Sequence, residues 1–256
     1  MKIGDYKLNI NDIFNKIYVL TIKRNADRHP TIKTILKKIH FEFWYGLDAK
    51  ITFTNAKSVS EIDDSFFESN NVDKGYVSRL TIGQFGAYFS ITKLIKHIAE
   101  NNFLNVLAFE DDIKILRNDW EDILLKAIQE LPPDWDLLLL GYNYDGIIHR
   151  LNYKRSFRLF IQFYDKCKSL VGMKNIIKSP VKFSMHLDIS GYSMGGHAYC
   201  ISKKGAQILS EHLTIMRDSG DILFSDLILK NKINAFSVYP CLFAQDSKFG
   251  SKTNVA

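Results

Sequence analysis

The chain has 256 residues, of which 46% are hydrophobic and 13% aromatic, enough to bury a sizeable core. Its formal net charge of +6 and pI of about 9.0 favour negatively charged partners: nucleic acid, an anionic membrane or a phosphorylated small molecule. The three cysteines are far apart and give no sign of a disulfide framework or a zinc site. No signal peptide and no apolar run near the about 18 residues of a membrane span is visible. We therefore expect a cytoplasmic protein, a placement compatible with peripheral association with a membrane.

Strand and helix patterns alternate through the first 141 residues. Short apolar, β-branched runs predict strands, and apolar residues at helical spacing predict the helices between them. The predicted strands are 17–22, 41–45, 106–109 and 135–141, and the predicted helices are 30–39, 83–98 and 120–128. Residues 50–78 are polar and lack a sustained period, so we expect a loop containing one short helix.

The second half begins with a basic stretch and then returns to the same alternation. Between Arg150 and Lys182 there are nine Lys or Arg and one acid. A glycine-led strand at 195–201, two helices and a last strand at 235–240 follow. This pattern predicts an α/β fold with a mostly parallel central sheet and helices on both faces. We expect a single domain over residues 1–256, with a basic insert at about 143–190.

Three consecutive acids, Glu110-Asp111-Asp112, end the predicted strand at 106–109. In an extended segment Glu110 and Asp112 point the same way and Asp111 the other way. Two carboxylates about 4 Å apart repel by roughly 1 kcal/mol in water and about 4 kcal/mol in a partly buried site. A divalent cation relieves that repulsion in an enclosed site, whereas water does so in an open turn, and the tripeptide alone leaves both readings open. Its place after a buried strand favours Mg²⁺ or Mn²⁺, which bind carboxylates together with a substrate's phosphates.

Four ordered motifs resemble glycosyltransferase family 25, which contains lipopolysaccharide glycosyltransferases and procollagen galactosyltransferases. The resemblance runs from about residue 16 to 246, and segments 50–78 and 143–190 match no motif. The motifs are Tyr18–Ile22 with Arg24 and Asp27-Arg28, then Leu80–Ser90, then Leu107–Asp112, then Gly196–Ser202 with Gly205-Ala206. The second motif departs from the family pattern, because Gln84, Ala87 and Ile91 stand where the family usually has Glu, Cys and His.

The resemblance implies a GT-A fold, a UDP-sugar donor, a Mn²⁺ or Mg²⁺ ion and inversion at the anomeric carbon. By that analogy Glu110, Asp111 and Asp112 fill the place of the DxD-type motif, with Glu110 and Asp112 as metal ligands and Glu110 or Asp111 touching the ribose. The other residues implied on the nucleotide side are Thr21, Arg24, Arg28 and Ser90. For Arg24 and Arg28 an exposed charged turn is the alternative.

An inverting transfer also needs a base that takes the acceptor's proton. We assign this role to Asp221, with Asp188 and Asp226 as reserves, although Asp221 also fits a helix N-cap. Gly196 and His197 are candidates for the acceptor side, where His197 could contact the acceptor or the diphosphate, and a structural histidine is the alternative. The segment Gln245-Asp246-Ser247 is a candidate late ligand of the metal, through Asp246, or of the diphosphate, or else part of a polar tail.

The basic insert fits acceptor recognition, nucleic-acid binding or a solvated face. An amphipathic helix near the acceptor is favoured, because no nucleic-acid-binding module is visible. The expected function is transfer of a hexose, galactose or glucose, from a UDP-sugar to a hydroxyl of a glycan or of collagen-type hydroxylysine. The alternatives are a catalytically silent nucleotide-sugar or carbohydrate-binding protein and a nucleotidyltransferase, which the missing Gly-rich loop disfavours.

Overall fold

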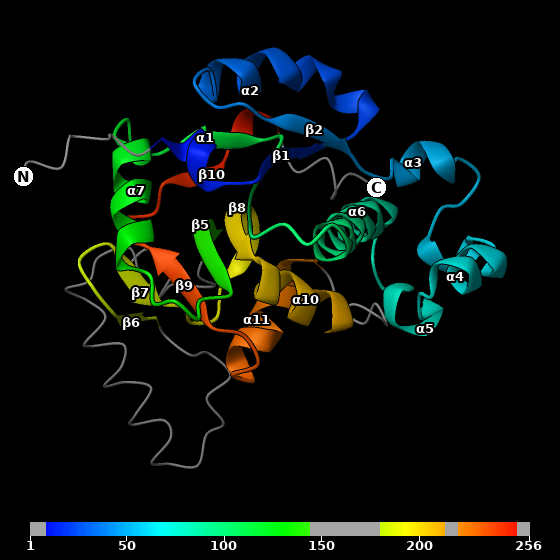
Figure 1. Ribbon diagram of the computed structural model, residues 1–256. Coiled ribbons are helices and arrows are strands. Elements are labelled where there is room, and N and C mark those ends of the chain that lie inside the picture. Colours follow the sequence, from blue (N-terminus) through cyan, green and yellow to red (C-terminus); the bar gives the residue numbers. More distant parts are fainter. Residues whose placement is uncertain (1–8, 144–179, 213–219, 250–256) are drawn as a thin grey trace, which may run out of the picture.

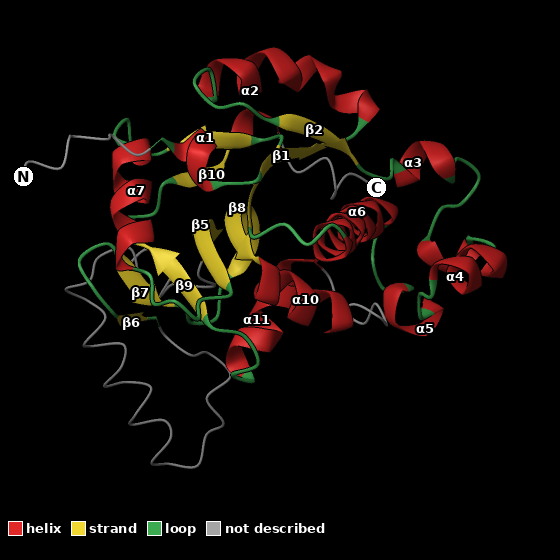
Figure 2. Ribbon diagram, in the orientation of Figure 1, coloured by secondary structure: helices red, strands yellow, loops and turns green. Residues whose placement is uncertain are grey.

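A computed structural model describes residues 9–143, 180–212 and 220–249. Within these residues ten strands form one sheet (Figures 1 and 2), with the main strand order β2-β1-β3-β8-β5-β9-β7-β6. Strands β2 (Glu42–Tyr45), β1 (Lys16–Thr21) and β3 (Asn105–Glu110) are mutually parallel. The antiparallel strand β8 (Met194–Ser202) lies between β3 and β5 (Leu137–Asn143), and β9 (Ala235–Val238) is parallel to β5. The predicted α/β architecture with a mostly parallel sheet is confirmed.

Four short strands were not predicted from the sequence. At one edge, β7 (Leu187–Ile189) pairs with β9 and with the two-residue β6 (Val181–Lys182). The other pair joins β4 (Ile113–Ile115), directly after the acids, to β10 (Phe243–Gln245) near the C-terminal end of the described chain. Two or three residues are too few to show a period, so pairing in space decides these strands.

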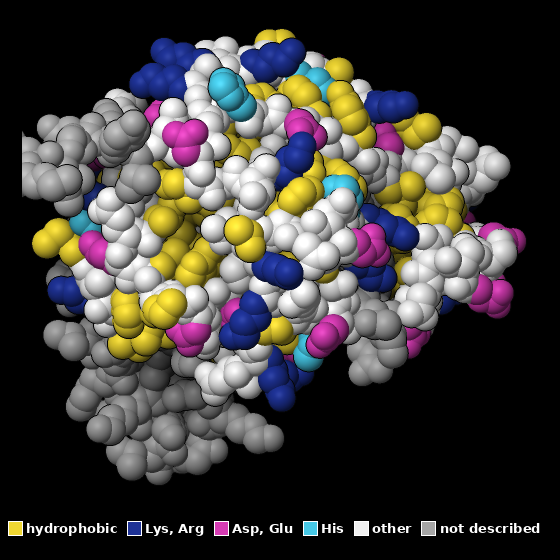
Figure 3. Space-filling view, viewed as in Figure 1, with side chains coloured by type: hydrophobic (Ala, Val, Ile, Leu, Met, Phe, Trp, Pro, Cys, Tyr) yellow, Lys and Arg dark blue, Asp and Glu magenta, His cyan; other side chains and the backbone are white. Residues whose placement is uncertain are grey.

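Helices cover both faces of the sheet (Figure 1). On one face, α1 (Ile10–Ile13), α2 (His29–Ile35) and α7 (Trp120–Glu130) pack into one apolar cluster. On the other, α6 (Ile82–Glu100), α10 (Lys203–His212) and α11 (Gly220–Leu229) pack into a second cluster. Lys and Arg side chains gather over α2 at the top of Figure 3, on the solvent side of this amphipathic element.

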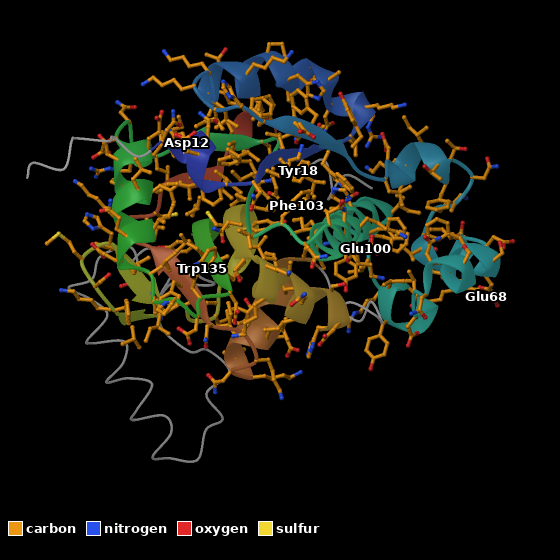
Figure 4. All side chains as sticks on the ribbon, viewed as in Figure 1. Asp12, Tyr18, Glu68, Glu100, Phe103 and Trp135 are labelled. Atoms are coloured by element: carbon orange, nitrogen blue, oxygen red, sulfur yellow. The ribbon has the colours of Figure 1, made fainter. Side chains whose placement is uncertain are left out.

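The central helix α6 starts at a capping box and is buried along the predicted stripe. Thr81 accepts a hydrogen bond from the Gln84 amide at 3.2 Å, and the Gln84 side chain accepts one from the Thr81 amide at 3.0 Å. Further along, the α6 residue His97 packs against Tyr18 of β1 and against Phe103, which follows the helix (Figure 4). Helix α6 is thereby fixed against the strand that leads into the site.

The prediction of a loop with one short helix at 50–78 was wrong. The segment forms α3 (Ala49–Thr52), η2 (Val59–Glu61), α4 (Asp64–Asn70) and α5 (Lys74–Val77). Asp63 and Asp73 cap α4 and α5, and Asn71 ends α4 at a positive φ of 54°. Helices of one or two turns depend on such caps and on docking, so they leave little periodicity in the sequence.

The basic insert lies largely outside the described residues, including the amphipathic helix predicted there. Of this insert the structure describes residue 143, which ends β5, and residues 180–190, which supply β6 and β7. Among the described helices, none combines the length and the apolar character needed to cross a bilayer.

Helix α10 packs on the backbone at the start of β5, and this contact requires glycine at position 205. A Cβ built there would lie 2.1 Å from the carbonyl oxygen of Asp136. We expect Gly205→Ala to lower the free energy of unfolding by about 1–3 kcal/mol, measured by urea denaturation, because backbone must shift. Gly75→Ala is the matched control, since the added Cβ meets only the exposed Asp73 carboxylate at 3.2 Å. An equal loss in both variants would contradict the packing argument.

Candidate functional site

The acidic tripeptide lies where β1 and β3 end side by side. β1 ends at Thr21 and β3 at Glu110, and the two strands pair in parallel with Leu20 opposite Glu110. The six-residue η1 (Lys23–Arg28) follows β1 directly. The sequence therefore brings a polar turn and an acidic turn to the same edge of the sheet, where ligands of parallel sheets bind.

Asp111 points into the protein and is held by three side chains from β1 and η1. Its Oδ2 accepts hydrogen bonds from Thr21 Oγ1 at 2.6 Å and Asn25 Nδ2 at 2.9 Å, and its Oδ1 accepts one from Arg28 at 2.5 Å. The Asp111 and Arg28 side chains are 8% and 4% exposed, so this ion pair is buried. A fully bonded carboxylate of this kind fixes the turn in one conformation.

Asp111 and Asp112 form the two-residue turn between β3 and β4, so the prediction of an extended segment across all three acids was wrong. The turn nevertheless brings the side chains of Glu110 and Asp112 close together. Together with His197 of β8 they offer one ligand atom each, and these atoms lie within 4.8 Å of one another. The Nδ1 atom of His197 is 2.8 Å from Glu110 Oε2. His197 reaches this position because β8 pairs antiparallel with β3, with Ala198 opposite Phe109.

Asp112 is largely buried beside a like charge. Burial, and then the neighbouring Glu110, raise the pKa of Asp112 to about 6, while a hydrogen bond from Gln245 opposes the shift. Gln245 Nε2 donates to Asp112 Oδ2 at 3.0 Å. Among the described residues, the buried Oδ1 atom of Asp112 has no hydrogen-bond partner. An enclosed carboxylate with a spare oxygen next to another carboxylate is suited to a cation.

The donor set fits a divalent cation of the Mn²⁺ type. Two carboxylates and one imidazole form a mixed oxygen and nitrogen set, which Mn²⁺ accepts and which Mg²⁺, preferring oxygen, accepts less well. A bound dication would also offset the repulsion that raises the pKa of Asp112. Of the three residues predicted to bind metal, Glu110 and Asp112 lie in this cluster, and His197 lies there in place of Asp246.

The remaining predicted nucleotide-side residues, Arg24 and Ser90, lie apart from the acidic cluster. Arg24 pairs with the Asp48 carboxylate at 3.2 Å and is 36% exposed. The buried Ser90 hydroxyl joins α6 to the loop after β2, accepting from the Leu47 amide at 2.8 Å and donating to the Gly86 carbonyl at 2.6 Å. Gly46 of the same loop donates its amide to the Thr21 carbonyl at 2.8 Å, so this loop adjoins the end of β1.

Asp246 touches the site through its backbone. Its amide donates to the Asp112 carbonyl at 2.6 Å, while its carboxylate accepts from the Lys248 amide at 3.0 Å. Glycine at position 196 allows α11 to pack closely on β8, because a Cβ there would lie 2.9 Å from the Phe224 ring. The side chain of Asp221 lies outside the described residues, and its backbone is the second residue of α11.

The two reserves for the base role are placed by other elements. Asp188 is fully buried in β7, opposite Ser237 of β9. Asp226 of α11 is paired with Lys230 at 2.7 Å, one helical turn away. Neither forms part of the group of Glu110, Asp112 and His197.

Two contacts of the site, those of Asn25 with Asp111 and of Gln245 with Asp112, were not predicted from the sequence. Asn25 lies in a charged turn that looks exposed, yet it is buried at 7% exposure. Gln245 reaches Asp112 because the three-residue strand β10 pairs with β4. The spacing of Thr21, Asn25 and Arg28, which places all three around one carboxylate, was the one available hint of a shared role.

The buried pair of Arg28 and Asp111 predicts an unequal response to matched substitutions of arginine. We expect Arg28→Met to lower the free energy of unfolding by about 3–5 kcal/mol, because Asp111 keeps a buried charge without its cation. Arg117→Met breaks an exposed pair with Asp119, where the side chains are 47% and 53% exposed. That control is expected to leave the free energy of unfolding nearly unchanged in urea denaturation at neutral pH, because solvent screens an exposed pair. Similar losses in the two variants would show that the Arg28 pair does not hold the turn.

Comparison with known proteins gives one family and several distant structures. No curated protein matched the sequence. The crystal structure of A197 from STIV shares 10% identity over 88% of this chain and 81% of that chain, with a TM-score of 0.39. An active-site mutant of LgtC shares 13% identity over 94% and 91%, with a TM-score of 0.41, and mouse xyloside xylosyltransferase 1 shares 14% over 86% and 76%, with a TM-score of 0.34. The model of glycosyltransferase family 25 (LPS biosynthesis protein) matches residues 14–224, more than half of the chain, which therefore belongs to this family.

Proposed function

We propose that this glycosyltransferase transfers a hexose from a UDP-sugar to a hydroxyl group, with a divalent cation held by Glu110, Asp112 and His197. The observation that carries the proposal is the convergence of these three side chains within 4.8 Å at the end of β3. Arg28 binds Asp111 and thereby holds the turn that carries Asp112. A cation held there would suit a diphosphate-linked donor, because it would offset the negative charge of both the carboxylates and the phosphates.

Charge near the end of β1 supports the donor side of the proposal. Thr21 and Arg28 are engaged with Asp111, so we assign them the task of orienting the acidic turn next to the nucleotide. Arg24 is partly exposed and is our candidate for the diphosphate, which a guanidinium can bind through paired hydrogen bonds. The loop held by Ser90 borders this side of the sheet.

The transfer needs a charged leaving group to be stabilised and an acceptor proton to be removed. A divalent cation, when bound, offsets the charge that develops on the departing diphosphate. Asp221, at the start of α11, is our candidate for the base that accepts the proton of the attacking hydroxyl. With attack from the face opposite the leaving group, the anomeric configuration inverts. A glycan is the acceptor class that we favour, in keeping with the family description.

The departures in the second motif have structural roles that leave the acidic cluster intact. Gln84 completes the capping box of α6, a role that Glu also fills, and Ile91 is buried in the core. Ala87 is exposed on the same helix. These positions give the catalytically silent alternative no specific support, so we favour an active enzyme.

The Asp112 carboxylate is the most direct test of the proposed activity. We expect Asp112→Asn to abolish UDP release from UDP-hexoses in the presence of Mn²⁺, because the change removes one anionic ligand, while the fold is retained. The measurement is mass spectrometry of products from a panel of nucleotide sugars with glycan and hydroxylysine acceptors. Asp119→Asn, which alters an exposed carboxylate in an exposed ion pair, is the matched control and should keep full turnover. Undiminished turnover by Asp112→Asn would refute the metal-dependent mechanism, and wild-type binding without turnover would favour the silent alternative.

The raised pKa of Asp112 predicts that stabilisation by Mn²⁺ depends on pH. Because the folded pKa of Asp112 is raised to about 6, its ionised form destabilises the metal-free fold. Protonation relieves this cost as pH falls through that value, and ionisation restores it as pH rises. Cation binding requires the ionised carboxylate, so stabilisation by Mn²⁺ should be largest above pH 6 and should shrink below it. We would measure the Tm with and without MnCl₂ at about pH 5 and about pH 7.5. A Tm shift that is equal at both pH values, or that persists in Asp112→Asn, would count against this site.

A further inference from the structure

The segment from Gln245 to Phe249, which we call the C-terminal strap, is fastened directly to the proposed cation site. It begins at the last residue of β10 and continues through η3 (Ser247–Phe249). Gln245 donates to the Asp112 side chain at 3.0 Å, and the Asp246 amide donates to the Asp112 backbone at 2.6 Å. The strap thus binds both the carboxylate and the main chain of one proposed ligand.

The far end of the strap is fastened to the same polar network. The Arg28 guanidinium lies 5.0 Å from the centre of the Phe249 ring, within range of a cation–π contact. Arg28 also binds Asp111 at 2.5 Å and lies 3.6 Å from Asp112 Oδ2. Within η3, the Phe249 amide donates to the Asp246 carbonyl at 3.1 Å. Both ends of this five-residue strap therefore depend on residues that surround the acidic tripeptide.

The two partners of Asp112 Oδ2 differ in charge, and this difference bears on cation binding. Arg28 is closer to Asp111 than to Asp112, so its positive charge mainly compensates Asp111. Gln245 is neutral, and its hydrogen bond fixes one oxygen of Asp112 without cancelling the negative charge. The other oxygen, Oδ1, is buried and has no hydrogen-bond partner among the described residues. Gln245 therefore orients the carboxylate and leaves its charge available to a cation.

We propose that Gln245 is a positioning residue for Asp112 and that the C-terminal strap and the cation stabilise each other. This inference rests on the proposed cation site. Side chains that hold a metal ligand from behind change metal affinity by about 10–100-fold when they are removed. Coupling between two binding events is reciprocal, so a strap that strengthens cation binding must itself be stabilised by the cation to the same degree.

The test compares Gln245→Leu with wild type and with Lys248→Ala, which truncates an exposed side chain of the same strap. Mn²⁺ affinity is measured by electron paramagnetic resonance of the free ion. We expect Gln245→Leu to weaken Mn²⁺ binding by about tenfold or more, with Lys248→Ala close to wild type. The metal-free Tm should be the same in all three proteins, because Gln245 is exposed. A purely structural role would lower that Tm and leave the affinity unchanged.

Hydrogen exchange tests the reciprocal half of the proposal. Mn²⁺ should slow exchange of the Asp246 and Phe249 amides in wild type, and should slow it less in Gln245→Leu. Unchanged Mn²⁺ affinity in Gln245→Leu, with Asp112-dependent binding in wild type, would overturn this inference and leave the proposed function standing. Wild-type protein that binds no Mn²⁺ would overturn both. If Gln245→Leu binds Mn²⁺ more weakly but Mn²⁺ does not slow exchange of the Asp246 and Phe249 amides in wild type, the coupling of strap and cation is overturned.

Discussion

The buried ion pair of Arg28 and Asp111 is the interaction on which the site depends. It joins the turn after β1 to the turn after β3 and encloses a charge that would be costly without its partner. With Asp111 held by Arg28, the turn after β3 brings Asp112 close to Glu110, and both lie beside His197. Adjacent acids thus have different roles. Asp111 is paired with Arg28 inside the protein, whereas Glu110 and Asp112 belong to the proposed cation site.

Electrostatic strain in the site comes from burial and from a like charge. Asp112 is enclosed next to Glu110, and its pKa rises because ionisation there is disfavoured. Arg28 could relieve this strain more fully if it were closer, but it lies 3.6 Å from Asp112 and 2.5 Å from Asp111. The negative charge of Asp111 is therefore compensated by Arg28, whereas that of Asp112 is compensated less. A site with such uncompensated negative charge is expected to bind a positive ligand.

The sequence predicted the parts of this site that follow from local periodicity. The central strands and the long helix α6 followed from apolar spacing, as did the place of the acids at the end of a buried strand. The predicted alternation across Glu110, Asp111 and Asp112 was wrong, because Asp111 and Asp112 form a turn. Predictions failed where the answer depends on pairing between distant segments. Gln245 belongs to a strand too short to show a pattern, and His197 meets Glu110 only because of the register between β3 and β8. Asn25 was missed because burial in a charged turn leaves no mark in composition.

The register between β3 and β8 decides whether the folded chain places His197 beside Glu110. Side chains on a strand alternate between faces, so a shift of β8 by one residue against β3 would turn His197 away from Glu110 and bring Gly196 or Ala198 into its place. Ala198 and Cys200 line one apolar cluster and Tyr199 and Ile201 the other, so the same shift would exchange their positions between two cores of different shape. Packing in the two apolar clusters thus stabilises the register that places His197 beside Glu110. A sheet with the shifted register would be less stable, whether or not a substrate is bound.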